Sequence, residues 1–166
     1  MRLRPLKPGD AACMLEWMHD PSVVRYMQTD FSRKTLEDCL RFIEAAQNAE
    51  RDIHLAITAD DDDAYLGTVS LKHIEKHQAE FAITIRACAM GSGISAQAMR
   101  SILEYGLKEL NLSRIYWCVS PENARAVRFY DKNGYRRIPA PDVPAYTAEQ
   151  RALYIWYATG PESDNA

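Results

Sequence analysis

Two glycines near the middle of the chain mark a position that could bind an anion. Gly91 and Gly93 follow an apolar run at 81–85 and precede a stretch whose apolar residues recur at helical spacing from Ile94 onward. The first backbone N–H groups of a helix lack intrahelical partners, and the helix dipole adds partial positive charge there. Glycines carry no Cβ atom to hold a ligand away from these amides. The pattern is typical of a phosphate or pyrophosphate socket, and it equally suits a plain strand-to-helix turn.

A second group of interest lies in the segment SPENARAVRFYDKNGY at 120–135. Asn123 is a suitable N-cap for a helix that begins at Ala124, and Gly134 is a suitable left-handed terminator for its other end. Tyr130 falls on the inward side of that helix. From the residues alone, Asn123 is a helix cap and Tyr130 a packing residue.

Composition narrows the possible functions. The chain has 166 residues, 47% of them hydrophobic, and a net charge of −3, so we expect one globular domain at 1–160 without a basic surface for nucleic acid. No apolar run approaches the roughly 20 residues that span a bilayer, and no signal-peptide core is present, which predicts a cytoplasmic protein without membrane contact. The four cysteines and four histidines lack metal-ligand spacing, so we expect no metal site. The polar tail at 161–166 is expected to be disordered.

The periodicity predicts elements that would position these residues. Strands are expected at 2–6, 54–58, 65–74, 80–85, 114–119, 135–138 and 152–159. Helices are expected at 11–18, 36–46, 94–110 and 124–133, the second of them opened by a capping box of Thr35 and Asp38. The acidic turn at 60–63 is expected to be a solvated hairpin loop rather than a cation site.

This order of elements resembles the GNAT (GCN5-related N-acetyltransferase) superfamily, and two motifs support the resemblance. Residues 90–95 (MGSGIS) match the family's Q/R-x-x-G-x-G/A loop, and Asn123, Tyr130 and Gly134-Tyr135 match its asparagine, tyrosine and G-[FY] signature. The resemblance covers nearly the whole chain. It implies an α/β (α+β) fold with a mixed central sheet of about seven strands and four helices.

The resemblance also implies acetyl-CoA as cofactor and assigns residues to it. Pantetheine amides would add to the strand edge at Ile83, Thr84 and Ile85, and Asn123 and Tyr130 would contact the pantetheine arm and its sulfur. Met90 stands where the family has Gln or Arg, so the loop lacks a cation, and the pyrophosphate would rest on the backbone, assisted by Arg100. The loop residues assigned to the cofactor are Met90, Gly91, Ser92, Gly93, Ile94, Ser95 and Ala96.

For catalysis, the resemblance implies direct attack of an amine within a ternary complex. Tyr130 would protonate the leaving thiolate, which a phenol with an ordinary pKa of about 10 is suited to do. Some family members carry a base five residues before the asparagine, where this chain has Cys118. Glu80 is the next candidate for the base that the ammonium form of the acceptor requires, and His73 and His77 are weaker ones.

The acceptor site of such a fold would lie between the segment after the first strand and the loop at 139–146. Its candidate residues are Trp17, His19, Tyr26, Met27, Asp30 and Phe31. The stretch at 15–43 resembles acetyltransferases of nucleotide-linked amino sugars and, more broadly, those of ribosomal-protein N-termini. The leading hypothesis is a small-molecule amine, such as an amino sugar, and a protein N-terminus is the alternative. A non-catalytic CoA-binding module is a third hypothesis. The chain is expected to act as a monomer or homodimer.

Overall fold

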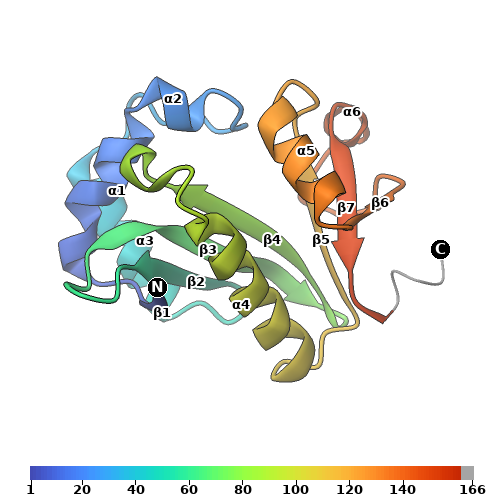
Figure 1. Cartoon of the computed structure of the whole chain (residues 1–166), viewed down its shortest axis with the longest axis horizontal. Coiled ribbons are helices and arrows are strands. Elements are labelled where there is room, and N and C mark those ends of the chain that lie inside the picture. Colours follow the sequence, from blue (N-terminus) through green and yellow to red (C-terminus); the bar gives the residue numbers. More distant parts are fainter. Residues whose placement is uncertain (162–166) are drawn as a thin grey trace.

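The structure is a computed structural model, and it describes residues 1–161. A seven-stranded mixed sheet forms its centre, with the order β1-β2-β3-β4-β5-β7-β6 (Figure 1). The strands are β1 (Arg2–Pro5), β2 (Ile53–Thr58), β3 (Tyr65–Glu75), β4 (Gln78–Ile85), β5 (Arg114–Val119), β6 (Arg136–Ile138) and β7 (Ile155–Thr159). The predicted fold class and all seven predicted strands are confirmed, with the last strand starting three residues later than expected.

Within residues 1–161, four short helices occur besides the four predicted ones. The helices are η1 (Pro8–Asp10), α1 (Ala11–Met18), α2 (Pro21–Val24), α3 (Leu36–Gln47), η2 (Ala87–Ala89), α4 (Ile94–Lys108), α5 (Ala124–Lys132) and α6 (Ala148–Ala152). The capping box of Thr35 and Asp38 opens α3 as expected. A capping box of Thr147 and Gln150 also opens α6, so the sequence carried a signal for that helix. For α2, Asp20 caps the helix and Pro21 occupies its first turn.

The feature of the sheet that matters most for function is the separation of β4 from β5. These parallel strands pair only from Gln78 to Glu80, opposite Arg114 to Tyr116. Beyond that point β4 stays paired with β3 as far as Ile85, and β5 stays paired with β7 as far as Val119. The two strands therefore diverge toward their carboxyl ends (Figure 1). The divergence leaves one edge of each strand open.

The two faces of the sheet carry different cores. One core lies beneath α4 and α5 and includes Trp117, whose indole ring stacks against Tyr157 and meets Phe81 and Tyr135 edge-on. A second core joins α1 and α3 to the sheet, and a third lies under the connection from β6 to β7. Since alternate residues of a strand face opposite sides, β4 directs Ala79 and Phe81 into the first core and Glu80 away from it.

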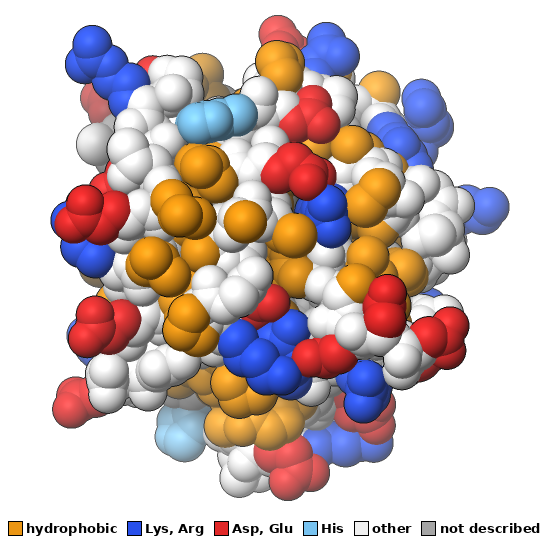
Figure 2. Space-filling model, turned by 90° about the vertical axis from the view of Figure 1, so that its left-hand side faces the viewer, with side chains coloured by type: hydrophobic (Ala, Val, Ile, Leu, Met, Phe, Trp, Pro, Cys, Tyr) orange, Lys and Arg blue, Asp and Glu red, His pale blue; other side chains and the backbone are white. Residues whose placement is uncertain are grey.

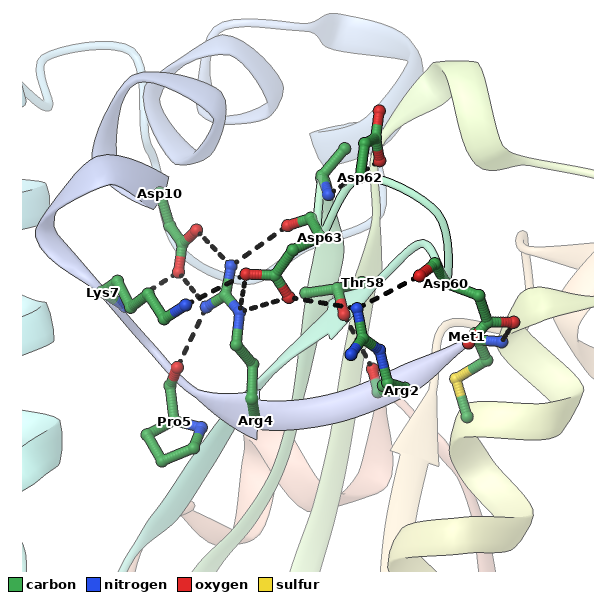
Figure 3. A network of polar contacts seen from close by, with 11 residues as sticks. Met1, Arg2, Arg4, Pro5, Lys7, Asp10, Thr58, Asp60, Asp62 and Asp63 are labelled. Carbon is green, nitrogen blue, oxygen red and sulfur yellow. Dashed lines mark hydrogen bonds and ion pairs between the residues drawn. The ribbon is translucent and has the colours of Figure 1, made fainter.

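The acidic loop between β2 and β3 makes ion pairs that the sequence analysis did not predict. Asp63 lies 2.9 Å from Arg4 Nε and 3.0 Å from Lys7 Nζ, while Asp60 accepts from the N-terminal amine at 2.6 Å (Figure 3). Arg4 also contacts the buried Asp10 at 2.8 Å. The segment is the expected, largely exposed hairpin loop between β2 and β3, and its ion pairs with basic groups near the N-terminus connect it to β1 and to the residues before η1.

The end of the molecule formed by α1 and α3 shows hydrophobic side chains among charged ones (Figure 2). Leu36, Leu40 and Phe42 of α3 contribute partly exposed apolar surface. Within residues 1–161, no helix combines the length and the apolar character needed to cross a bilayer.

Candidate active site

A cavity of 420 Å³ occupies the space where β4 and β5 diverge. Its walls come from both strands, from the start of α5, from the loop after α2 and from the connection before β7. Its lining residues include Tyr26, Phe31, Lys72, Glu80, Ile83, Thr84, Ile85, Met90, Trp117, Cys118, Asn123, Tyr130 and Tyr146. Trp117 Nε1 and Glu80 Oε2 are buried and have no hydrogen-bond partner among residues 1–161. Buried polar atoms without a hydrogen bond need an explanation, such as a catalytic role or a bound water or ligand.

The loop between β4 and α4 forms one end of this site. Gly91 and Gly93 both have positive φ angles, 80° and 83°, which explains why glycine occupies these positions. Ser92 Oγ donates to Ala89 O at 2.6 Å and so points back into the loop. The N–H groups of Ile94, Ser95 and Ala96 donate to no other described residue.

A cation that the sequence analysis missed lies beside this loop. Arg125, in the first turn of α5, places Nη2 3.6 Å from the point that a Cβ atom would occupy at Gly91. It is exposed and makes no ion pair with another described residue. Free amides and a guanidinium therefore converge near Gly91. No motif could have found Arg125, because the contact joins residues 34 positions apart and depends on where the start of α5 lies relative to the loop before α4.

Asn123 serves as the N-cap of α5. Its Oδ1 accepts the N–H of Ala126 at 3.2 Å, which is the capping role predicted from its residue type. Its side-chain Nδ2 donates to no described residue, and Asn123 lines the cavity. The amide can therefore cap the helix and still offer two N–H donors to a ligand.

Tyr130, about two turns further along α5, is 9% exposed and lines the same cavity. Its ring packs edge-on against Trp117 and Tyr135 and is tilted against Tyr157. The packing role that the sequence predicts for Tyr130 is therefore observed. Its hydroxyl makes no hydrogen bond to a described residue. Burial raises the pKa of Tyr130 well above its ordinary value, with smaller contributions from Tyr135 and Tyr157. The phenol therefore remains a proton donor at any pH near neutrality.

Glu80 lies at the point where β4 leaves β5, and it is 3% exposed. Tyr146 donates its hydroxyl to Glu80 Oε1 at 2.5 Å. Lys72 Nζ lies 3.8 Å from the same oxygen, and His73 Nε2 lies 3.5 Å from Oε2. Buried carboxylates need such compensation. Burial, together with Cys118 and Glu80, raises the pKa of Tyr146 far above its ordinary value, so this phenol stays protonated.

Cys118 stands five residues before Asn123, at the position that a base would occupy according to the family resemblance. Its Sγ lies 3.8 Å from the Tyr146 hydroxyl and 3.9 Å from Gln28 Nε2. Burial raises the pKa of Cys118 to about 11. A thiol with this pKa is neither a base nor a nucleophile near neutral pH.

The predicted acceptor residues are dispersed. Tyr26 and Phe31 line the central cavity. Trp17 is buried in the core beneath α1, where it donates to Tyr65 OH at 3.1 Å and meets Phe31 edge-on. Asp30 is exposed, accepts the N–H of Ser32 and lines neither the central cavity nor the one beneath α1 and α3. Tyr146 and Lys72, which the sequence analysis did not single out, meet Glu80 instead.

A family model and related sequences both identify this chain as similar to N-acetyltransferases. The family model for the acetyltransferase (GNAT) domain matches residues 1–136. An uncharacterised N-acetyltransferase of Bacillus subtilis (strain 168) is 30% identical over 138 residues, which are 81% of this chain and 78% of that protein. Spermidine N(1)-acetyltransferase of Escherichia coli (strain K12) is 28% identical over 81% of this chain and 72% of its own length.

The fold is shared with a solved structure. The crystal structure of spermidine N-acetyltransferase from Vibrio cholerae, in complex with CoA and spermine, superposes on this chain with a TM-score of 0.77. The match covers 95% of this chain and 92% of that one, at 21% identity.

Proposed function

The chain belongs to the GNAT acetyltransferase family, and we propose that its acceptor is the primary amine of a small molecule. As a member of this family it is an N-acetyltransferase that uses acetyl-CoA. The proposal concerns the acceptor and the residues that carry the reaction. It is supported by the cavity between β4 and β5, in which two protonatable groups on different elements, Glu80 and Tyr130, share one lining.

The residues of the site suit acetyl-CoA. The diphosphate would meet the free N–H groups of Ile94, Ser95 and Ala96, where the start of α4 favours negative charge, and Gly91 leaves room for it next to Arg125. The open edge of β4 at Ile83 and Ile85 would pair with the amides of the pantetheine arm, as an added strand would. Asn123 would donate its side-chain N–H groups to the same arm. Bound here, the cofactor supplies an acetyl thioester to the cavity.

Tyr130 would act as the general acid. Its buried hydroxyl has no partner in the described chain and lines the cavity, so it is available to donate a proton to the departing sulfur. A high pKa keeps the proton on Tyr130 until a strong base is formed beside it. A thiolate formed in this cavity is such a base, because partial burial raises the basicity of thiolates as well.

Glu80 would act as the general base. Acceptor amines are mostly ammonium ions at neutral pH, with a pKa of about 10, so one proton must leave before the nitrogen can attack. Glu80 Oε2 is buried without a hydrogen bond and can receive this proton, while Tyr146 holds Oε1 in place. His73, which is 48% exposed at its side chain, lies 3.5 Å from Oε2 and offers a path to solvent.

The test is an acetyl-CoA assay that measures free thiol with a panel of amines and peptides. We expect small primary amines to release thiol faster than peptides with a free N-terminus, and an amino sugar in the panel tests the acceptor class that the sequence analysis named. Faster release with peptides would favour protein N-terminal acetylation, the alternative acceptor class. Release with neither class would remove the proposed small-molecule acceptor.

A further inference from the structure

A second cavity of 330 Å³ adjoins the first beneath α1 and α3. Lys72 and the β4 segment from Ala82 to Thr84 line both cavities, and so does Phe31. The two spaces are therefore neighbours across the same stretch of β4. If the reacting amino group of an acceptor lies at Glu80, the rest of the acceptor molecule would lie close to this second cavity.

The walls of the second cavity are mainly apolar. Trp17, Phe31 and Phe42 supply aromatic surface, and Thr68, Ser70 and Thr84 supply hydroxyl groups. His54 donates to or accepts from Ser70 Oγ through Nδ1 at 2.7 Å, and burial lowers its pKa below the ordinary value of 6.5. His54 is therefore neutral at physiological pH, and its ring adds to the uncharged lining.

The charged groups of this cavity leave no carboxylate free to bind a cation. Asp38 is the acid of the lining, and both of its oxygens are occupied, one by Thr35 at 2.9 Å and the other by Arg41 at 2.7 Å. These contacts lower the pKa of Asp38 to about 2. Lys34 also lines the cavity and makes no ion pair with a described residue, whereas Lys72 faces Glu80. Lys34 therefore gives the cavity a positive charge that no lining carboxylate neutralises.

We propose that the second cavity holds the non-reacting end of the amine acceptor, and that it selects acceptors whose far end is apolar and has no second positive charge. This inference rests on the proposed small-molecule acceptor. A second ammonium would lose its hydration in the cavity and would meet Lys34 without a free carboxylate in return. An alkyl or aryl group would gain by leaving water for the aromatic wall. The acceptor preference of this chain would then differ from that named for its spermidine-acetylating relatives.

The experiment compares n-alkylamines with diamines of the same length in the thiol-release assay. For alkylamines, kcat/KM should rise by about fourfold for each methylene added until the cavity is filled. Hexylamine should exceed 1,6-diaminohexane by at least tenfold, although the diamine has twice as many reactive groups. A flat alkyl series, or a diamine that matches hexylamine, would overturn the inference while leaving the amine acetyltransferase intact. No thiol release with any amine would instead overturn the proposed function, and this inference with it.

A charge-reversal variant tests the cause of the preference. Lys34→Glu places a carboxylate at the cavity, and the ratio of kcat/KM for hexylamine to that for the diamine should fall at least fivefold. Lys132→Glu makes the same charge change at the far end of α5, outside both cavities, and serves as the matched control. Equal ratios in Lys34→Glu and Lys132→Glu would show that the second cavity does not set the preference.

Discussion

The two sides of the gap between β4 and β5 are built in different ways. The cofactor side, with the loop at 86–93 and the start of α5, is made of two strand-to-helix junctions, and much of what it offers is backbone. The acceptor side brings Lys72, Glu80, Cys118 and Tyr146 together from four separate segments through side-chain contacts. The cofactor side is therefore formed by local chain geometry, whereas the acceptor side is formed by tertiary packing.

This difference predicts which substitutions each side tolerates. Where amides bind the ligand, side-chain identity matters little as long as the turn is kept. Where a buried carboxylate must be held by a phenol and balanced by a lysine, each side chain matters. Substitutions on the two sides should therefore separate binding of acetyl-CoA from use of the acceptor.

Tyr130→Phe should have the largest effect. The ring packing against Trp117 and Tyr157 is kept, and only the proton donor is lost. We expect kcat to fall by about 10³-fold with the affinity for acetyl-CoA nearly unchanged, as measured by steady-state kinetics and calorimetry. Turnover equal to that of the unmodified protein would remove Tyr130 from the mechanism.

Glu80→Gln should lower kcat/KM for the amine by about 10²-fold and leave acetyl-CoA binding unchanged. The amide can still accept from Tyr146, but it cannot take a proton from the acceptor. The variant then depends on amine that is already neutral, so its rate should rise about tenfold per pH unit up to the amine pKa of about 10.

The matched control is Glu75→Gln, which removes a carboxylate at the end of β3, where Glu75 pairs with Arg51. Its kinetics should follow those of the unmodified protein at every pH. A loss in Glu75→Gln as large as that in Glu80→Gln would show that charge, rather than the position of the base, governs the rate.

Arg125→Met tests the cation on the cofactor side. Loss of one exposed guanidinium next to the diphosphate should raise the KM for acetyl-CoA by about tenfold at low salt, and by less at high salt. Turnover at saturating acetyl-CoA should stay within about twofold. Lys132→Met, at the other end of α5, is the control, and an identical rise in both variants would contradict a specific contact.

Alkylation of Cys118 should show the smallest effect near neutral pH. With a pKa of about 11, its thiolate becomes about tenfold more abundant with each pH unit from pH 7 to about pH 10. Peptide mass spectrometry after iodoacetamide should show the exposed Cys88 modified first. Fast modification of Cys118 at pH 7 would contradict the buried, protonated thiol that the acceptor side requires.

The sequence was most informative where function depends on local geometry. The positions and positive φ angles of Gly91 and Gly93, the cap at Asn123 and the turn at Gly134 all follow from residue type and spacing. The sequence did not indicate that Tyr146 would meet Glu80 or that Arg125 would reach Gly91. Those contacts join residues that are 34 or more positions apart, and they are set by packing of the β6–β7 connection and of α5, which carries no short-range signal.

A crystal structure with CoA tests the central claim most directly. We expect the sulfur within hydrogen-bond distance of the Tyr130 hydroxyl, in the gap between β4 and β5, and the diphosphate on the amides at 91–96. A CoA sulfur outside the gap, or a Tyr130 hydroxyl turned away from it, would contradict the account.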